Sequence, residues 1–300
     1  MKPNWLLLEG NAEFKNNEIN FQPNKPDEEV EDEFKNYQPS VIRSDLFFNS
    51  GNIELMVKIS GDKDKVQLQL GVDGNNFVNV GLNTDSYAYG IAEFSNGKFN
   101  HLSMQGKGIS PPVNDWLKLK LNYIGSVLEL FINDVLVSKS QVTFHNSQVR
   151  LVYRGVEPAT VKDIKFLPKN PQAFIVMQFS DTYDSLYKEV IVPVCEEYGY
   201  EVIRADDMYT TGLIIEDITR AIQESSLVIA DITPNNPNVY YEVGYAHGIN
   251  KNTILLSDKN REKLPFDISG FRLLFYENSI AGKPNVESAL RKHLEGIKNA

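Results

Sequence analysis

Two acidic residues, Asp231 and Glu242, occupy positions where a charged side chain can do chemistry. Residues 227–230 form a short continuous apolar run, the pattern of a strand that is buried on both faces of a parallel sheet. Asp231 follows this run directly. Because the ligand crevice of an open α/β sheet lies outside the carboxyl ends of its strands, Asp231 is predicted to face a ligand.

Glu242 belongs to the helix expected after the turn-rich segment 233–237. Asn238 is a favourable N-cap residue, which would place Glu242 in the opening turn or just beyond it. The dipole and free amides at a helix start favour an ionised carboxylate. We therefore expect Glu242 to be charged at neutral pH and available as a nucleophile or cation stabiliser. The alternative is that Glu242 only supports the helix start electrostatically.

Polar residues also follow the other expected strands of this region. Some come after the strand at 174–177, others after the strand at 201–204, and a glycine precedes a helix whose amides can meet a phosphate. The predicted substrate-binding residues are Gln178, Phe179, Ser180, Asp206, Asp207, Gly212, Asp231 and Asn238.

From residue 173 the chain alternates between strand and helix patterns, which predicts a flavodoxin-like, doubly wound parallel sheet of about five strands. Pro193 should kink the first helix or start a second segment. We expect strands at 174–177, 201–204, 227–230, 253–256 and 272–276, and helices at 183–198, 213–224, 239–249 and 286–297.

Residues 173–276 resemble the nucleoside 2-deoxyribosyltransferase-like family, most specifically in the segment Glu-Val-Gly-Tyr-Ala at 242–246. A second resemblance is to bacterial TIR-like NAD-cleaving effectors, through Asn-Val-Tyr-Tyr-Glu-Val-Gly at 238–244 and Leu-Pro-Phe-Asp-Ile-Ser-Gly at 264–270. Both families break an N-glycosidic bond beside one Glu, which the resemblances place at Glu242. They also imply that Gln178, Phe179 and Asp206 hold the base and sugar.

These resemblances predict an enzyme that cleaves or transfers at the N-glycosidic bond of a nucleoside, nucleotide or NAD. A carboxylate below the sugar would stabilise or capture the oxocarbenium-like centre. The resemblances further suggest a role in bacterial defence. We expect no cofactor, NAD being a possible substrate, and a homo-oligomeric assembly. Two alternatives remain: a nucleotide-sensing module without catalysis, and a carbohydrate-binding protein that acts through its N-terminal domain.

Residues 1–168 read as short strands separated by turns, which predicts a β-sandwich, and residues 169–300 form the α/β domain. Residues 116–123, followed by a hairpin turning at Asn133-Asp134, resemble the laminin-G/concanavalin-A-like jelly roll. Trp116 and Phe131 are expected to be core residues. We interpret this domain as a sensor, an oligomerisation surface, or both.

Composition limits the classes of partner. The formal net charge of −10 argues against broad contact with nucleic acid, which relies on clustered Lys and Arg. The acidic segment 27–33 is interpreted as a solvated loop. The single cysteine, Cys195, fits a reducing compartment, and no apolar run has the length of a membrane span. We therefore expect a soluble cytoplasmic protein that binds no metal, because its four histidines lack metal-ligand spacing.

Overall fold

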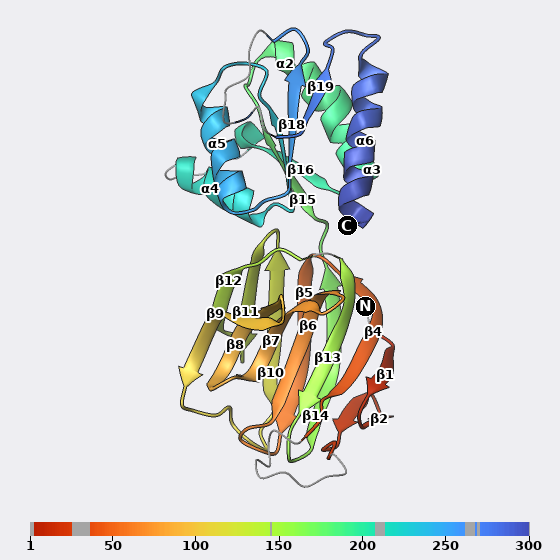
Figure 1. Ribbon diagram of the computed structural model, residues 1–300, viewed down its shortest axis with the longest axis vertical. Helices are drawn as coiled ribbons and strands as arrows, with labels where there is room; N and C mark the ends of the chain where they lie inside the picture. Colours follow the sequence, from red (N-terminus) through yellow and green to blue (C-terminus); the bar gives the residue numbers. More distant parts are fainter. Residues whose placement is uncertain are drawn as a thin grey trace. The chain divides into compact units, whose positions relative to one another are not determined.

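The computed structural model describes residues 3–25, 37–144, 146–207, 214–261, 268 and 271–299. The chain divides into two compact units, which Figure 1 shows as an all-β part and a part with helices around a sheet. The first unit comprises Met1–Tyr123 and Val127–Lys169, and the second comprises Ile124–Ser126 and Asn170–Ala300. Among the helices of the described residues, none combines the length and apolar character needed to cross a membrane.

The first unit is a β-sandwich of two seven-stranded antiparallel sheets, as the jelly-roll prediction requires. Sheet 1 has the order β1 (Trp5–Glu9), β4 (Ser40–Phe48), β13 (Ser147–Arg154), β6 (Lys65–Asp73), β7 (Asn76–Thr84), β8 (Tyr87–Ser95), β9 (Lys98–Lys107). Sheet 2 has the order β12 (Val135–Gln141), β11 (Val127–Ile132), β10 (Leu117–Ile124), β5 (Gly51–Ile59), β14 (Ala159–Pro168), β3 (Glu18–Phe21), β2 (Ala12–Lys15).

Alternation of apolar and polar residues explains how the two sheets pack. Every second residue of β5 and β10 is buried, and these residues meet the inward side chains of sheet 1 in one continuous core. The predicted hairpin turns at Asn133 and Asp134, whose φ angles are 49° and 65°. Asn and Asp tolerate this left-handed region, so the tight turn forms without glycine.

The prediction that Trp116 and Phe131 are core residues is wrong. Phe131 alternates with the buried Leu130 and Ile132, so it lies on the outer face of sheet 2. Trp116 precedes β10 and lies beneath two lysines of that same outer face. Both rings are half-buried because lysine side chains cover them.

The second unit contains the predicted five-stranded parallel sheet, with the order β16 (Glu201–Arg204), β15 (Gln172–Val176), β17 (Leu227–Asp231), β18 (Thr253–Asp258), β19 (Leu273–Tyr276). Its helices cover both faces, which Figure 1 shows on either side of the strands. Helices α4 (Ile214–Glu224) and α5 (Pro237–Gly248) bury one apolar cluster. A second cluster on the other face involves α3 (Val192–Glu197) and α6 (Lys283–Asn299).

The first helical segment of this unit is interrupted, as Pro193 predicts. Helix α2 (Asp181–Leu186) passes into a π-helical turn, Tyr187–Ile191, before α3 begins with Pro193 in its first turn. A proline there has no N–H to donate, and its ring displaces the carbonyl one turn earlier. The wider turn accommodates both effects.

Candidate functional site

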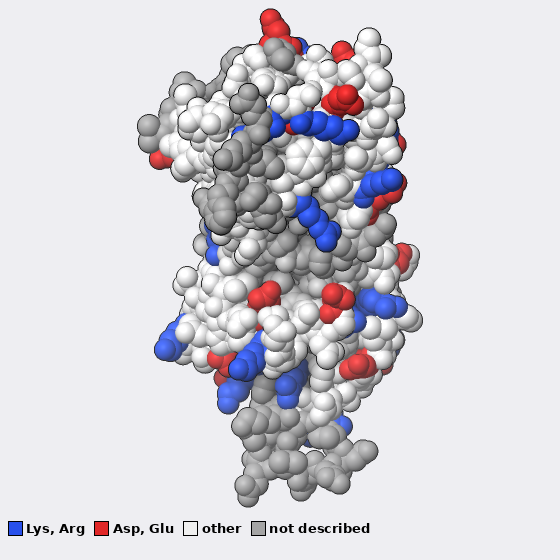
Figure 2. Space-filling view, turned by 45° about the horizontal axis from the view of Figure 1, so that its top comes forward, with Lys and Arg blue, Asp and Glu red and all other residues white. Residues whose placement is uncertain are grey.

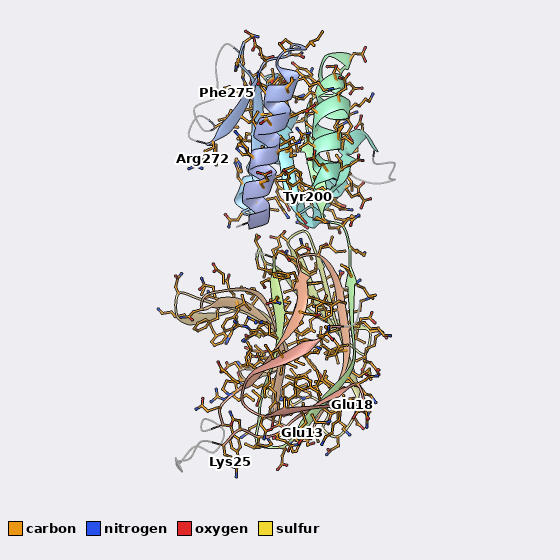
Figure 3. The ribbon with its side chains drawn as sticks, turned by 90° about the vertical axis from the view of Figure 1, so that its right-hand side faces the viewer. Glu13, Glu18, Lys25, Tyr200, Arg272 and Phe275 are labelled. Carbon is orange, nitrogen blue, oxygen red and sulfur yellow. The ribbon has the colours of Figure 1, made fainter. Side chains whose placement is uncertain are left out.

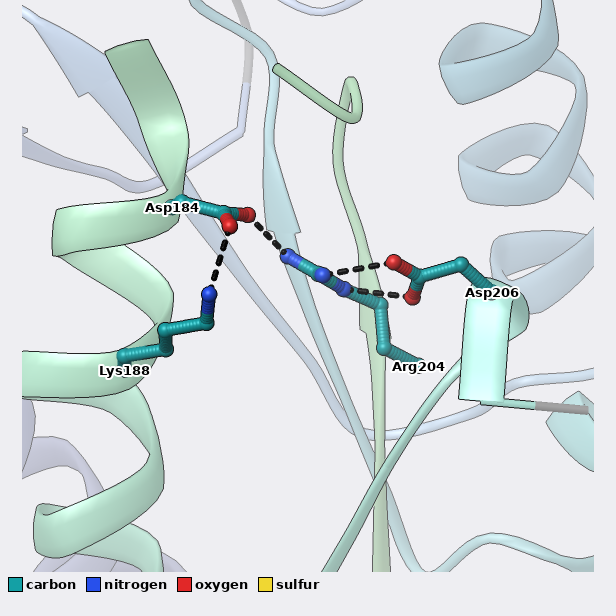
Figure 4. A network of polar contacts seen from close by, with 4 residues as sticks. All are labelled: Asp184, Lys188, Arg204 and Asp206. Carbon is teal, nitrogen blue, oxygen red and sulfur yellow. Dashed lines mark hydrogen bonds and ion pairs between the residues drawn. The ribbon is translucent and has the colours of Figure 1, made fainter. Parts of the chain in front are cut away.

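Two of the predicted substrate-binding residues, Phe179 and Asp206, lie around a buried arginine in the second unit. Figure 4 shows this arginine, Arg204, between Asp206 and Asp184. The side chain of Arg204 is only 6% exposed. Its Nε and Nη2 each donate to one carboxylate oxygen of Asp206 at 2.6 Å, and the ring of Phe179 lies 5.3 Å from the guanidinium. The Asp206 carboxylate is therefore held in a two-point ion pair.

The same arginine is held from its other side by helix α2. Arg204 Nη1 donates to Asp184 at 2.9 Å, and Lys188 donates to the other oxygen of that carboxylate at 2.8 Å. These hydrogen bonds, from Lys188 and then from Arg204, lower the pKa of Asp184. The ring of Tyr187 stacks 4.0 Å from the guanidinium. The cluster joins α2 to the end of β16 as a closed structural unit.

Asp231 stands at the carboxyl end of β17, as predicted, but it is enclosed there. The residue is 1% exposed, and its carboxylate accepts hydrogen bonds from the Thr233 amide at 3.0 Å, the Thr233 hydroxyl at 2.5 Å and the Tyr276 hydroxyl at 3.1 Å. Burial raises the pKa of Asp231 despite these bonds. The carboxylate therefore ties β17 to β19.

Glu242 differs from its prediction in position and in charge. Asn236 is the N-cap of α5, because its side chain accepts from the Asn238 amide at 2.9 Å, so the prediction of Asn238 as the cap is wrong. Glu242 consequently lies in the second turn, beyond the free amides of the helix start. Burial raises the pKa of Glu242 to about 7. Glu242 is therefore less readily ionised near neutral pH than the sequence predicts.

The remaining predicted site residues are dispersed. Asn236 donates from its side chain to Gln178 at 3.4 Å, and Ser180 precedes α2 without a side-chain capping bond. Gly212, the side chain of Asp207 and most of the segment 264–270 lie outside the described residues, as does the acidic segment 27–33. Phe179 and Asp206 thus meet on Arg204, while Asp231 belongs to a separate buried network.

A different constellation, which sequence reasoning missed, lies on the outer face of sheet 1. Four side chains form a row across neighbouring strands, because each residue is the direct cross-strand partner of the next. In the order β4, β13, β6, β7 this polar row consists of Arg43, Arg150, Gln69 and Asn79. Directly opposed residues on neighbouring strands lie close together, so a single ligand can contact all four side chains.

Two groups of the polar row are buried without a hydrogen-bond partner among the described residues. Asn79 is 6% exposed and its side-chain oxygen Oδ1 has no donor, and Nε of Arg150 has no acceptor. Gln67, on the same face of β6, instead donates to the Thr84 hydroxyl at 3.1 Å. Because buried polar groups are nearly always paired, the two unpaired groups indicate a missing partner on this face.

Aromatic rings border the polar row on one side. Phe77, Phe94 and Phe99 are cross-strand neighbours in β7, β8 and β9, two residues along from the row. The rings of Phe77 and Phe94 stack 5.1 Å apart, and Phe99 lies 4.8 Å from Phe94 with half of its surface exposed. This arrangement offers an apolar surface beside polar groups.

A second feature of the sandwich is a cleft of about 760 Å³ at the edges formed by β1, β2, β3 and β14. Its walls include Trp5 and Phe14, which provide aromatic surface. Its polar lining residues include Asn16, Glu18 and Asp163, and Glu18 is labelled in Figure 3. Asp163 has a φ of 53° at an irregularity of β14, a type of distortion that redirects side chains.

Comparisons with known proteins concern the sandwich. No family model and no curated protein matches the chain. Solved structures with similar folds include a carbohydrate-binding module from Bacillus subtilis, with 15% identity, a TM-score of 0.43, and coverage of 53% of this chain and 92% of the other. They also include a β-glucanase from Bacillus licheniformis, with 13% identity, a TM-score of 0.38, and coverage of 52% and 87%.

A further solved structure is described as a protein of unknown function with a galectin-like fold from Bacillus subtilis. It shows 12% identity and a TM-score of 0.42 over 54% of this chain and 87% of the other. The two seven-stranded antiparallel sheets make the first unit a β-sandwich, the architecture that the sequence predicts. No finding supports the resemblance of residues 173–276 to the nucleoside 2-deoxyribosyltransferase-like or TIR-like families.

The prediction of an enzyme that cleaves the N-glycosidic bond of a nucleoside or NAD is therefore corrected. The similar structures are named for carbohydrate binding and β-glucan hydrolysis, not for nucleoside or NAD chemistry. In the structure, Asp206 is held in an ion pair with Arg204, and burial raises the pKa of Glu242 to about 7.

Proposed function

We propose that the first unit is a carbohydrate-binding domain, and that its ligand lies on the outer face of sheet 1 across the polar row. The observation that carries this proposal is the buried, unpaired side-chain oxygen of Asn79, in the same row as the unpaired Nε of Arg150. A ligand that hydrogen bonds to these groups would remove the penalty of leaving them unpaired.

Sugar chemistry suits the residue types of this face. Each hydroxyl of a sugar both donates and accepts, so it can pair with amide groups such as those of Gln69 and Asn79 and with the donors of Arg150. The C–H faces of a sugar ring pack on aromatic surface, which Phe94 and Phe99 provide beside the row. The polar row and the neighbouring aromatic rings therefore match the hydroxyl groups and the C–H faces of a saccharide chain bound along this face.

The residues of the polar row favour binding over hydrolysis. Glycoside hydrolysis uses a pair of carboxyl groups on either side of the bond, whereas the row consists of two arginines and two amides. Asp45, the carboxylate nearest in sequence on β4, is held by Asn4 through two hydrogen bonds of 2.7 and 2.8 Å. The proposed role of the row is recognition of an intact glycan.

A glycan array with the purified full chain, followed by calorimetric titration of each positive glycan, tests this proposal. We expect saturable binding, reduced about fivefold in Asn79→Ala through loss of one hydrogen bond. Asn122→Ala is the matched control, because Asn122 lies on the outer face of sheet 2 and already pairs with Glu129 at 2.9 Å.

Thermal unfolding of each variant checks that the sandwich remains folded. An array without a single saturable ligand would remove the proposal. Binding that survives Asn79→Ala unchanged but disappears in Trp5→Ala would transfer the site to the cleft between the sheet edges.

A further inference from the structure

We infer that the glycan bound by the polar row is anionic, carrying carboxylate or sulfate groups that lie between Arg43 and Arg150. This inference rests on the function proposed above and specifies its ligand. It goes beyond that function, because a neutral glycan would also satisfy the two amides of the row.

Two arginines lie opposite each other on the outer face of sheet 1. Arg43 of β4 and Arg150 of β13 are direct cross-strand partners, and strand alternation places both on the outer face, since Ile42, Val149 and Leu151 are buried in the core. Like charges directly opposite each other destabilise a sheet pair. An anion bound between the two guanidinium groups would offset the repulsion between them.

Neither arginine of this pair has an internal counterion among the described residues. Among the described residues, no carboxylate forms an ion pair with Arg43 or Arg150, and no hydrogen bond to either guanidinium is found. By contrast, Arg204 pairs with Asp206 at 2.6 Å and Arg291 pairs with Glu197 at 2.9 Å. The two arginines of sheet 1 thus differ from Arg204 and Arg291.

The overall charge of the protein is negative, although the two arginines form a local positive site. The chain carries a formal net charge of −10, and Figure 2 shows basic and acidic side chains interspersed on the face in view. General attraction of polyanions is therefore not the basis of the site. A local pair of guanidinium groups, half-buried and so partly protected from screening by salt, is a specific receptor for one or two anionic groups.

The geometry of the arginine side chains matches that of an anionic group. A guanidinium presents parallel N–H donors that match the two oxygens of a carboxylate or sulfate. Gln69 lies next to Arg150 in the row and Asn79 lies next to Gln69. An acidic sugar seated on the arginines would therefore place its hydroxyls, or those of the following sugar, over the two amides.

The test uses the full chain and two pairs of matched polymers, in which only the charge differs. Polygalacturonate is compared with its methyl ester, and dextran sulfate with dextran, by calorimetric titration at low and high salt. We expect one acidic polymer to bind at least tenfold more tightly than its neutral partner, and the preferred pair identifies carboxylate or sulfate as the recognised group.

The variants Arg150→Gln and Arg43→Gln assign the effect to the arginines. Each should weaken binding of the acidic polymer roughly tenfold to a hundredfold, and should weaken binding of the neutral partner by a much smaller factor, because only the acidic polymer loses a charged contact. Lys118→Gln is the control, because Lys118 is a basic residue of sheet 2 that is paired with Asp134 at 2.7 Å. If one arginine variant fails to fold, the other still provides the comparison.

The outcomes separate the two proposals. Equal binding of acidic and neutral polymers, or acidic binding that survives both arginine variants, would overturn the anionic ligand and leave carbohydrate binding in place. Absence of binding to every polymer and to every glycan of the array would remove both. A loss of equal size in Lys118→Gln would show a nonspecific charge effect and would also overturn the inference.

Discussion

The two outer faces of the sandwich differ in how their polar groups are paired. On sheet 2, Lys118 pairs with Asp134 at 2.7 Å, and Lys139 pairs with Glu129 at 2.9 Å. On sheet 1, Arg43 and Arg150 face each other and lack an ion pair among the described residues. These lysines of sheet 2 are paired within the face, whereas we propose that the two arginines of sheet 1 pair with a ligand.

Aromatic side chains show the same contrast. Lysines cover the rings on sheet 2: Lys162 and Lys58 lie 3.9 and 5.1 Å from the centre of the Trp116 ring, and Lys120 lies 5.4 Å from that of Phe131. On sheet 1, Phe99 remains half-exposed at the end of its aromatic cluster. A face covered by its own side chains contributes to stability, and an uncovered face is available for recognition.

The largest expected effect comes from removing both charges of sheet 1. The double variant Arg43→Gln, Arg150→Gln should lose more than about a hundredfold in affinity for the preferred acidic glycan, because two charge-assisted hydrogen-bonding groups are lost. Lys118→Gln, Lys139→Gln removes two charges from sheet 2 and should change the affinity less than about twofold. Calorimetric titration measures both, and equal losses would end the distinction between the faces.

A second prediction uses Glu242, a half-buried carboxyl group of the second unit. Its raised pKa of about 7 means that the folded state holds a proton more tightly than the unfolded state does. Stability should therefore fall as pH rises from about 4.5 to 7 and beyond, and Glu242→Gln should remove this loss, with a gain of roughly 1–3 kcal/mol at pH 8. Urea unfolding at pH 5 and pH 8 measures the difference.

For Glu242, an equal effect of the glutamine substitution at both pH values would show that the carboxyl group is not held in its neutral form. Glu216→Gln is a suitable control, because Glu216 is an exposed glutamate of α4 in the same unit and makes no side-chain hydrogen bond among the described residues. Its substitution should leave the pH profile of the wild-type chain unchanged.

The third prediction compares two polar residues of the same face. Gln67→Leu should destabilise the sandwich by about 1 kcal/mol, because it removes the hydrogen bond to Thr84. Asn79→Leu should leave stability unchanged or raise it by about 1 kcal/mol, because its oxygen has no partner to lose, while glycan affinity falls. Equal destabilisation in the two variants, measured by urea unfolding, would argue that Asn79 is structurally satisfied.

The smallest expected effect concerns the aromatic border. Phe99→Ala should weaken glycan binding about threefold through loss of ring contact, whereas Phe131→Ala on sheet 2 should not affect it. Titration of the two variants with the same glycan measures this. An effect confined to Phe131→Ala would place the ligand on the opposite face.

Much of the fold was predictable because local patterns determine it. In the second unit, apolar runs such as residues 227–230 are bounded by turn residues, so the strands and the helices between them follow from composition and period. In the first unit, alternation identified strands such as β5 and β10. Pro193 also predicted the break in the first helical segment.

The candidate site was not predictable in the same way, because it depends on the pairing of distant strands. Arg43 and Arg150 become neighbours only when β4 and β13 pair, and no local pattern specifies that register. The alternation of Gln67 and Gln69 with the apolar residues of β6 does indicate a polar outer face. For Glu242, resemblance suggested a catalytic role, but its burial is a tertiary property that the motif does not contain.

A crystal structure of the full chain with a bound oligosaccharide tests the central claim most directly. We predict a ligand that lies across β4, β13, β6 and β7. A hydroxyl of the sugar should donate a hydrogen bond to Asn79 Oδ1, and an anionic group should lie between Arg43 and Arg150. An oligosaccharide seated in the cleft beside Trp5, with the polar row facing only solvent, would contradict it.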